Sequence, residues 1–456
     1  MAYRSVDPST GQLIAEYPDA TPQQLEDALA AAASVTMPEL TERTAALKRI
    51  AQSFRDRAEE LAGIIAREMG KPVRQGLGEL RVVADIWQWY ADRPELLDDR
   101  ELPTDWNGRQ ARMQLRPIGP ILGIMPWNYP YYQVARLAAP NLLLGNPVII
   151  KHASSCTQAA LAIQEIVDAS GLPAGAYQTV LATTDQIAQL IEDPRIQGVS
   201  LTGSERAGAA VAAVAGRALK RCVLELGGSD PFIVLGTDDL DALVSAAISA
   251  RTANAGQACT SAKRFIVHES LYEDFVGRLA EGFQSLRIGS ALEEGVELGP
   301  LSSEAAAADL VAQVDSAVAE GAQLVGGSRI DRPGAYVEPG VLTGVTPDMK
   351  VWHEELFGPV AMVVPVRDAA EAVAVANDSP YGLGATVFDT DPERAAWVAE
   401  RLDAGMVAVG AFGSSRPELP FGGVKRSGFG RELGPDAVAE FANRRLLTEP
   451  AANPAG

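Results

Sequence analysis

The sequence predicts an α/β protein with two doubly wound lobes, each built on a mostly parallel sheet. Short apolar runs alternate with amphipathic helical segments through most of the chain, which is typical of parallel sheets covered by helices on both faces. The chain has 456 residues, long for a single hydrophobic core. The alternation also occurs in two consecutive series, so we expect two α/β lobes.

The residues before the first strand series are predicted to form helices. Thr21 can cap a helix that begins at Pro22, and Gln24 can complete a capping box. Longer helices follow, because apolar residues recur at helical spacing over residues 47–69 and 80–90. These apolar faces are expected to pack in the core or at an interface, and we assign them no chemistry.

Two strand series follow, one on each side of Gly227-Gly228. Each predicted strand is a short apolar run bounded by turn residues or by a helix. In the first series the runs are residues 121–125, 148–151, 177–181, 198–202 and 222–226. In the second series they are residues 231–235, 265–267, 360–364 and 406–409. We therefore expect the two lobes to join near this glycine pair.

Composition and charge restrict the partners of this protein. The chain is 47% apolar and 21% charged, as in soluble globular proteins, and its formal charge is −20. An acidic chain lacks the basic face that nucleic acid or an anionic membrane requires. The N-terminus has no apolar signal core, and no run is long enough to span a bilayer. We expect a cytoplasmic protein that acts on a small molecule, with no nucleic-acid or membrane partner.

Cysteine and histidine are scarce and scattered. The three cysteines, Cys156, Cys222 and Cys259, are too few and too far apart for a disulfide framework or a zinc site. The three histidines have no ligand spacing around them. This pattern predicts a protein from a reducing compartment that holds no metal.

Cys259 is the candidate nucleophile. It lies among small residues in the segment 253–260, three positions after Gly256. A nucleophilic thiol needs such space, because both a substrate and a cofactor must approach the sulfur closely. A free cysteine is also commonly a small core residue, so this segment alone leaves both roles open.

Two further segments give Cys259 its context. Glu225 ends a buried strand in the segment Leu224-Glu225-Leu226-Gly227-Gly228, and Asn128 lies in the stiff turn Pro126-Trp127-Asn128-Tyr129-Pro130. Together with residues 253–260, these segments resemble the aldehyde dehydrogenase superfamily in order and spacing. The resemblance runs from about residue 6 to residue 441.

The resemblance implies a domain arrangement. Residues 1–105 and 119–226 correspond to a dinucleotide-binding domain, and residues 227–433 to a catalytic domain. Residues 106–118 and 434–456 correspond to a small β oligomerisation unit, which implies a homodimer or a homotetramer.

The resemblance also implies a covalent mechanism. Cys259 attacks the aldehyde, and Asn128 with the Cys259 N–H holds the oxyanion, a role on the order of 3–4 kcal/mol for one donor. Hydride then passes to a nicotinamide, and Glu225 activates the water that hydrolyses the thioester. From the residues alone, Asn128 could instead bond a local turn and Glu225 could form a structural ion pair. Relatives that transfer the acyl group to coenzyme A tend to lack this Glu, so its presence favours release of a free acid.

The cofactor residues implied by the resemblance lie in four places. Gly203 and Ser204 correspond to the pyrophosphate site at a helix N-terminus, Lys151 to a ribose contact, and Glu355 with Phe357 to the nicotinamide side. We also place Trp127 and Gly227 in this site. Members that prefer NAD often carry Glu where this chain has Ser154, so we expect NADP to be favoured, with NAD as second choice. His152 stands where relatives have proline.

Within the family, the chain looks most like the bacterial succinate-semialdehyde branch. Arg136 and Ser415 occupy positions that such relatives use to bind the substrate carboxylate, with a helix-surface ion pair as the alternative role for Arg136. Some relatives carry a second arginine where this chain has Ala253, and Arg251 or Arg416 could compensate. Ser261 replaces a cysteine that forms a disulfide switch in some relatives. A general aliphatic aldehyde enzyme and a catalytically silent relative remain the alternatives.

Overall fold

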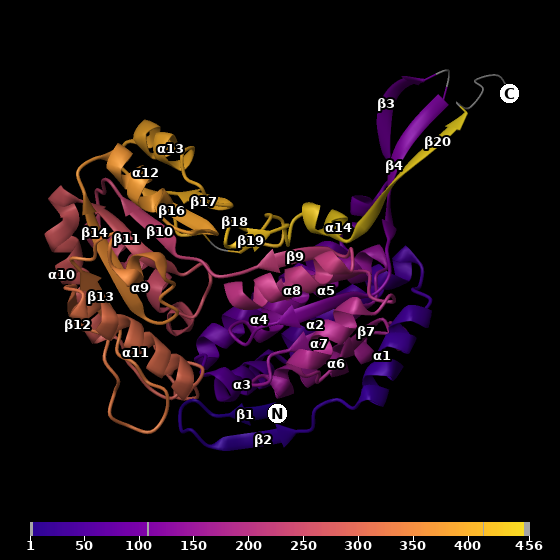
Figure 1. The fold of residues 1–456 in the computed structure, drawn as a ribbon, viewed down its shortest axis with the longest axis horizontal. Coiled ribbons are helices and arrows are strands. Elements are labelled where there is room, and N and C mark those ends of the chain that lie inside the picture. Colours follow the sequence, from indigo (N-terminus) through magenta and orange to yellow (C-terminus); the bar gives the residue numbers. More distant parts are fainter. Residues whose placement is uncertain (1–2, 107–108, 414, 451–456) are drawn as a thin grey trace.

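The computed structural model describes residues 3–106, 109–413 and 415–450. Figure 1 shows two α/β lobes side by side and a β arm that projects away from both. The first lobe comprises most of the N-terminal half, and the second lobe comprises the orange part of the chain. The predicted alternation of strands and helices in two series is confirmed.

The first lobe is built on a six-stranded sheet of order β19-β9-β8-β5-β6-β7. Its neighbours are parallel except where β19 pairs antiparallel with β9. The strands are β5 (Ile121–Met125), β6 (Val148–His152), β7 (Tyr177–Thr179), β8 (Gly198–Thr202), β9 (Arg221–Glu225) and β19 (Gly428–Phe429).

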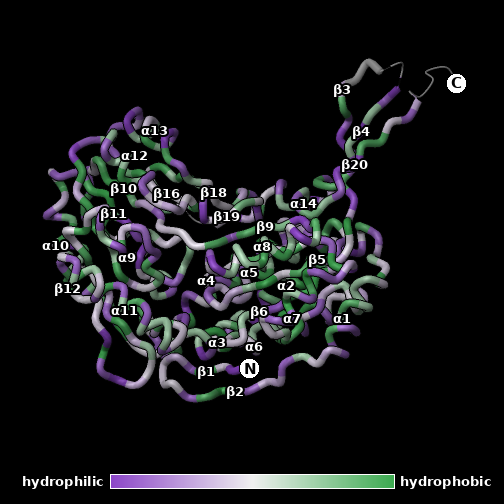
Figure 2. Tube along the Cα trace, viewed as in Figure 1, coloured by the Kyte–Doolittle hydropathy of each residue, from purple (hydrophilic) through white to green (hydrophobic). Residues whose placement is uncertain are grey.

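Helices cover both faces of this sheet. Ile121 and Met125 face one core, whereas Leu122 and Ile124 face the other, because successive side chains of a strand point to opposite faces. The first face packs against α2 (Leu40–Asp56), α3 (Ala58–Met69), α4 (Val73–Ala91), α5 (Pro130–Leu144) and α6 (Thr157–Asp168). The second packs against α1 (Pro22–Ser34), α7 (Thr184–Glu192) and α8 (Glu205–Arg217). Figure 2 shows hydrophobic residues concentrated in these layers.

The second lobe contains a seven-stranded sheet of order β12-β13-β14-β11-β10-β16-β17, parallel except at β12. Its strands are β10 (Asp230–Val234), β11 (Ala262–His268), β12 (Gln323–Gly326), β13 (Gly340–Thr343), β14 (Val360–Val366), β16 (Gly384–Phe388) and β17 (Met406–Val409). One face packs against α9 (Leu240–Thr252) and α10 (Glu269–Ser285). The other packs against α11 (Glu304–Ala319), α12 (Ala369–Asn377) and α13 (Pro392–Ala399).

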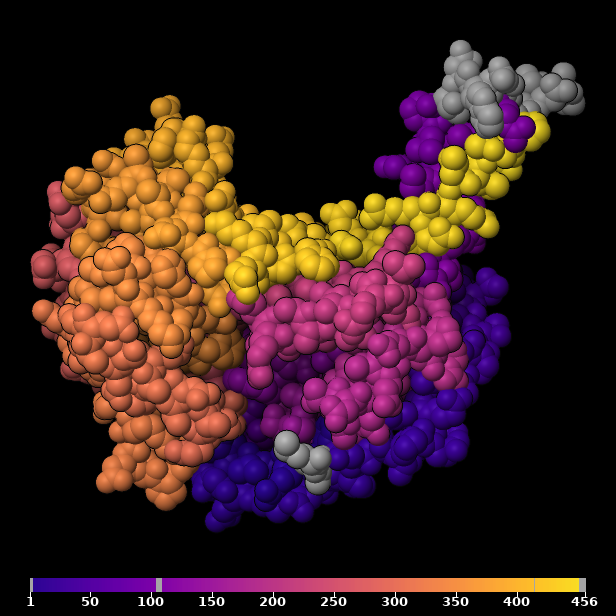
Figure 3. All heavy atoms as spheres, in the orientation of Figure 1, coloured from indigo at the N-terminus to yellow at the C-terminus, as the bar shows by residue number. Residues whose placement is uncertain are grey.

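The arm is a three-stranded antiparallel sheet of β3 (Arg100–Trp106), β4 (Arg109–Pro117) and β20 (Ala442–Pro450). It begins at Arg100, earlier than the expected segment 106–118. The chain between the second lobe and the arm runs across the first lobe, where it appears yellow in Figure 3. There β19 extends the first sheet, and Ala437 and Val438 of α14 (Asp436–Glu440) are buried in the first core. The expected boundary at residue 433 therefore does not coincide with a structural boundary.

Smaller elements complete the fold. They are the hairpin β1 (Tyr3–Val6) and β2 (Leu13–Tyr17), the pair β15 (Tyr381–Gly382) and β18 (Val424–Lys425), and the 3₁₀ turns η1 (Pro94–Leu97), η2 (Ala253–Gly256) and η3 (Lys350–His353). Thr21 caps α1 with the predicted capping box. Among the described residues, no helix has the length and apolarity needed to cross a membrane.

The lobes join where β9 leads through Gly227 and Gly228 into β10. A Cβ on Gly228 would lie 2.7 Å from the carbonyl oxygen of Cys259, a distance that real side chains do not reach. Only glycine therefore lets the strand connection pass this close to the candidate nucleophile. The junction and the Cys259 segment form one packed unit.

Candidate active site

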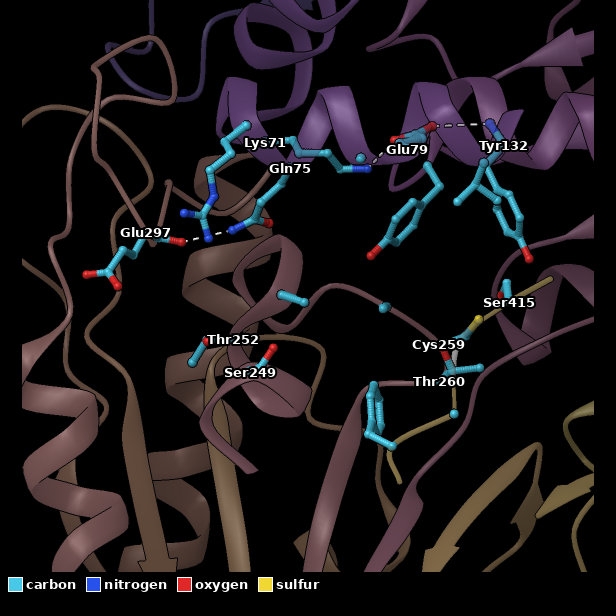
Figure 4. Close-up of a pocket in the computed structure, with 18 of the residues that line it drawn as sticks. Lys71, Gln75, Glu79, Tyr132, Ser249, Thr252, Cys259, Thr260, Glu297 and Ser415 are labelled. Carbon is cyan, nitrogen blue, oxygen red and sulfur yellow. Dashed lines mark hydrogen bonds and ion pairs between the residues drawn. The ribbon is translucent and has the colours of Figure 1, made fainter. Parts of the chain in front are cut away.

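A pocket of about 620 Å³ lies between the lobes, with Cys259 in its lining. In Figure 4, Cys259 and Ser415 lie toward one end of this pocket, whereas Gln75 and Glu297 lie toward the other. The first lobe contributes residues of α4 and α5, and the second contributes residues of α9 and of the Cys259 segment. A concave site shared by two domains is a typical position for an enzyme active site.

The Cys259 segment has a strained backbone. Asn254 and Ala255 both adopt φ values near the left-handed region, 53° and 52°, and Gly256 follows at 74°. Each such non-glycine residue costs about 1–3 kcal/mol, which persists only where the surroundings hold it. Gly256 is required as well, since a Cβ there would lie 2.4 Å from the carbonyl oxygen of Gly358.

Two buried cations hold this strained segment. The Arg251 guanidinium donates to the carbonyl of Gly256 at 2.6 Å and to that of Ala262 at 2.8 Å. The Lys263 ammonium donates to the carbonyls of Ala258 at 2.9 Å and of Cys259 at 2.7 Å. Arg251 therefore stabilises the loop through backbone carbonyls. It does not line the pocket, so it is not placed to bind a substrate there.

Asn128, the predicted oxyanion donor, lies against the same segment. Its Nδ2 donates to the Gln257 carbonyl at 3.0 Å, and its own carbonyl accepts from Asn254 Nδ2 at 2.8 Å. An amide NH2 group has two donor hydrogens, so one remains for a further acceptor. The Asn128 side chain is thus fixed against the backbone of Gln257, which lies two residues before Cys259 in the sequence.

The Cys259 thiol is protonated in this environment. Burial raises its pKa to about 12, although the cations Arg136 and Lys263 act in the opposite direction. The thiolate is the nucleophilic form, so a base or a further nearby positive charge is needed during reaction.

Glu225 is the predicted base. Its carboxylate is buried, and neither oxygen has a hydrogen-bond partner among the described residues. Burial raises the pKa of this carboxyl well above its usual range, Glu432 adds to this effect, and Arg136 opposes it. A buried carboxyl group without partners is costly in a purely structural role. Glu225 does not line the pocket, and its role as base stays a prediction.

Arg136 forms an ion pair with Glu432 instead of facing the pocket. It is fully buried on α5, and its Nε lies 2.7 Å from Glu432 Oε2. Its guanidinium also stacks on the rings of Tyr132 and Phe421, at 4.8 Å and 4.3 Å from the centroids. These two rings line the pocket, whereas Arg136 itself does not. Its proposed contact with a substrate carboxylate stays a prediction, while Ser415 lies in the lining as expected.

Sequence reasoning missed several residues of this wall. Glu79 accepts hydrogen bonds from the backbone N–H groups of Tyr131 and Tyr132 at 3.0 and 3.1 Å, and so caps α5. Lys71 pairs with Glu79 and lies 3.5 Å from the centroid of the Tyr129 ring. The available signal was Glu79, a charged residue one position before Leu80 on the apolar side of its helix, with Lys71 eight residues earlier, because charged residues are buried mainly when they are paired.

The predicted nicotinamide-side residues gather beside the lobe junction. Glu355 Oε1 accepts from the Gly228 N–H at 3.1 Å and lies 3.1 Å from the Lys263 ammonium. A Cβ on Gly227 would lie 2.5 Å from Glu355 Oε2, so a side chain there would displace the Glu355 carboxylate. The rings of Trp127 and Phe357 meet edge to face at a centroid distance of 5.8 Å.

The remaining cofactor residues lie at the carboxyl ends of β6 and β8, which flank β5. Lys151 is partly buried at the end of β6, and Ser154 is exposed just beyond it. Gly203 follows β8, and Ser204 caps α8 by accepting from the Ala207 N–H at 3.3 Å. A cation, small hydroxyl groups and an open helix N-terminus fit a phosphorylated dinucleotide.

His152 links these two parts of the site. Its Nε2 lies 2.9 Å from the carbonyl oxygen of Pro130, and burial lowers its pKa to about 4. The neutral ring therefore connects the strand that presents Lys151 to the turn that holds Asn128. A proline at position 152 has no such hydrogen-bonding group.

The sequence profile of the aldehyde dehydrogenase family matches residues 1–447, and the chain belongs to this family. It is an oxidoreductase with the aldehyde dehydrogenase fold, so the predictions of family, fold and reaction class are confirmed.

Within this family, the chain is similar to several succinate-semialdehyde dehydrogenases. The chain is 49% identical to a succinate-semialdehyde dehydrogenase [NADP(+)] of Deinococcus radiodurans, over 98% of this chain and 94% of that protein. It is 42% identical to a succinate semialdehyde dehydrogenase [NAD(P)+] of Escherichia coli K12, over 96% of each chain. Among solved structures, succinic semialdehyde dehydrogenase from Streptococcus pyogenes in complex with NADP+ superposes with a TM-score of 0.96 at 40% identity, covering 98% and 100% of the two chains.

Proposed function

We propose that this protein oxidises succinate semialdehyde to succinate, with NADP as the preferred hydride acceptor and NAD as second choice. The observation that carries the proposal is Cys259, held on a strained loop in the pocket between the lobes beside Asn128. The named activities of the relatives support the substrate and the cofactor.

The chemistry follows from the positions of three side chains. The Cys259 sulfur attacks the aldehyde carbon, and its proton leaves to a base or to water. The free Asn128 N–H and the Cys259 backbone N–H stabilise the oxyanion. NADP, when bound, accepts the hydride. Cys259 then carries the acyl group as a thioester, and Glu225 takes a proton from the water that releases the acid.

Residues in two groups would hold NADP. Trp127, Gly227, Glu355 and Phe357 would surround the nicotinamide side, near Cys259. Lys151, Ser154, Gly203 and Ser204 would hold the phosphates and the adenine ribose. Ser154 carries no charge, so it does not repel a 2′-phosphate.

We also propose a homodimer or a homotetramer in the cytoplasm. The arm exposes apolar Leu446, which is 60% exposed in the single chain, and the unpaired outer edges of its sheet. Such edges commonly pair with another strand.

A broad-specificity aliphatic aldehyde dehydrogenase is the second candidate. The observation in its favour is the Arg136–Glu432 ion pair, which leaves mostly aromatic side chains on that wall of the pocket.

A steady-state assay decides between the two. We expect kcat/KM to be higher for succinate semialdehyde than for butanal, and higher with NADP than with NAD. A preference for butanal would contradict the proposed substrate, and a preference for NAD would contradict the proposed cofactor.

A further inference from the structure

The positive charges around the pocket are mostly engaged by other groups. Arg136 pairs with Glu432, Lys71 pairs with Glu79, and Arg251 and Lys263 bond backbone carbonyls. The Arg416 side chain is 65% exposed, lies 3.8 Å from Glu418 and does not line the pocket. Neither of the two arginines considered as replacements for the arginine missing at Ala253 is therefore placed to meet a substrate.

Arg74 differs from these cations. It lines the pocket from the first turns of α4, is exposed, and forms no ion pair or hydrogen bond with any described residue. Gln75, the next residue, lies toward the end of the pocket away from Cys259 in Figure 4. Arg74 is adjacent to Gln75 and exposed, so we place it at the solvent-facing end of the pocket, away from Cys259.

The surroundings of Arg74 leave its guanidinium accessible. Gly78 lines the pocket one helical turn later, and open space lies where its Cβ would be. Gln75 is fixed, because its Nε2 donates to the Glu297 carbonyl at 2.9 Å and its Oε1 accepts from the Asn254 N–H at 2.7 Å. Glu297 also lines the pocket, and its carboxylate accepts from the Arg287 backbone N–H at 3.0 Å.

We propose that Arg74 is the residue that captures the carboxylate of an incoming semialdehyde at the pocket mouth. The inference rests on the proposed function, since it assumes an anionic aldehyde. A chain with a formal charge of −20 repels such a substrate at long range, so capture requires local positive charge. Arg74 provides a planar guanidinium that can bind a carboxylate through two N–H groups.

The test compares Arg74→Gln with the wild type on succinate semialdehyde and on butanal. We expect kcat/KM for succinate semialdehyde to fall about five- to twentyfold, through KM, with kcat and the butanal reaction unchanged. The ionic-strength dependence of kcat/KM for succinate semialdehyde is expected to weaken in the same variant. Arg74→Lys, which keeps the charge, should recover most of the loss.

Arg81→Gln is the matched control. Arg81 is an exposed arginine on the same helix outside the pocket lining, so its loss changes net charge equally. A similar effect from Arg81→Gln, or equal effects of Arg74→Gln on both aldehydes, would overturn the role of Arg74. If the wild type prefers butanal, the proposed function itself fails, and that result is distinct because it appears before any substitution.

Discussion

The two ends of the proposed cofactor site are built differently. Around Cys259, the backbone is strained and is held by buried side chains such as Arg251 and Lys263. Around Ser154 and Ser204, the side chains are exposed, and the bonds that cap α8 are local. Groups that perform the chemistry must be fixed precisely, whereas groups that choose between cofactors can change without disturbing the fold.

The largest expected effect is at the buried end. Cys259→Ala should lower turnover by about 10⁴-fold or more, because Cys259 is the only cysteine among the described residues of the pocket lining and a thioester requires a thiol. The thermal midpoint and the affinity for NADP should stay close to those of the wild type, since only one sulfur is removed. Measurable turnover at a wild-type rate would exclude Cys259 as the nucleophile.

Glu225→Gln should act on a different step. We expect steady-state turnover to fall about 10²- to 10³-fold, after a burst of about one NADPH per active site. The wild-type rate should rise with pH through the raised pKa of Glu225, because only the carboxylate can accept a proton, and the variant should lose this rise. Stopped-flow absorbance measures both. Absence of a burst would indicate that Glu225 acts mainly on the thiol.

Removing the Arg136–Glu432 ion pair should have an intermediate effect on catalysis. Removing one partner of a buried pair is destabilising, so the double variant Arg136→Gln/Glu432→Gln is the better choice. Because Arg136 lowers the pKa of Cys259, its loss should slow alkylation of Cys259 by iodoacetamide between pH 7 and 9. If Arg136 acts only through the thiol, kcat/KM should fall about tenfold for charged and uncharged aldehydes alike. A rise in KM for succinate semialdehyde alone would instead support a carboxylate contact by Arg136.

The parts of the molecule that could be predicted from the sequence are those determined by neighbouring residues. Strand and helix alternation, the capping box at Thr21 and the glycines at the junction depend on local pattern and local space, which the sequence records directly. The ion pair of Arg136 with Glu432 joins residues nearly 300 positions apart, and no periodicity connects them. The return of β19 to the first sheet is equally non-local, so the predicted boundary at residue 433 missed it.

The smallest expected effect is at the exposed end, and it tests cofactor choice. A 2′-phosphate carries close to two negative charges. If both groups were shielded from water at an effective dielectric near 20, a glutamate at position 154 would repel it by roughly 4 kcal/mol for each pair of unit charges. Ser154 is exposed, however, so solvent screens most of that repulsion and an effect of about tenfold is the better expectation.

Ser154→Glu should therefore raise KM for NADP about tenfold, lower KM for NAD and leave kcat with NAD unchanged. Lys151 is partly buried at the same end of β6, and burial lowers its pKa. Ser154→Ala is the matched control, because it removes the hydroxyl without adding charge. An equal change in cofactor preference from both variants would mean that the hydroxyl, and not the absence of a carboxylate, determines the choice.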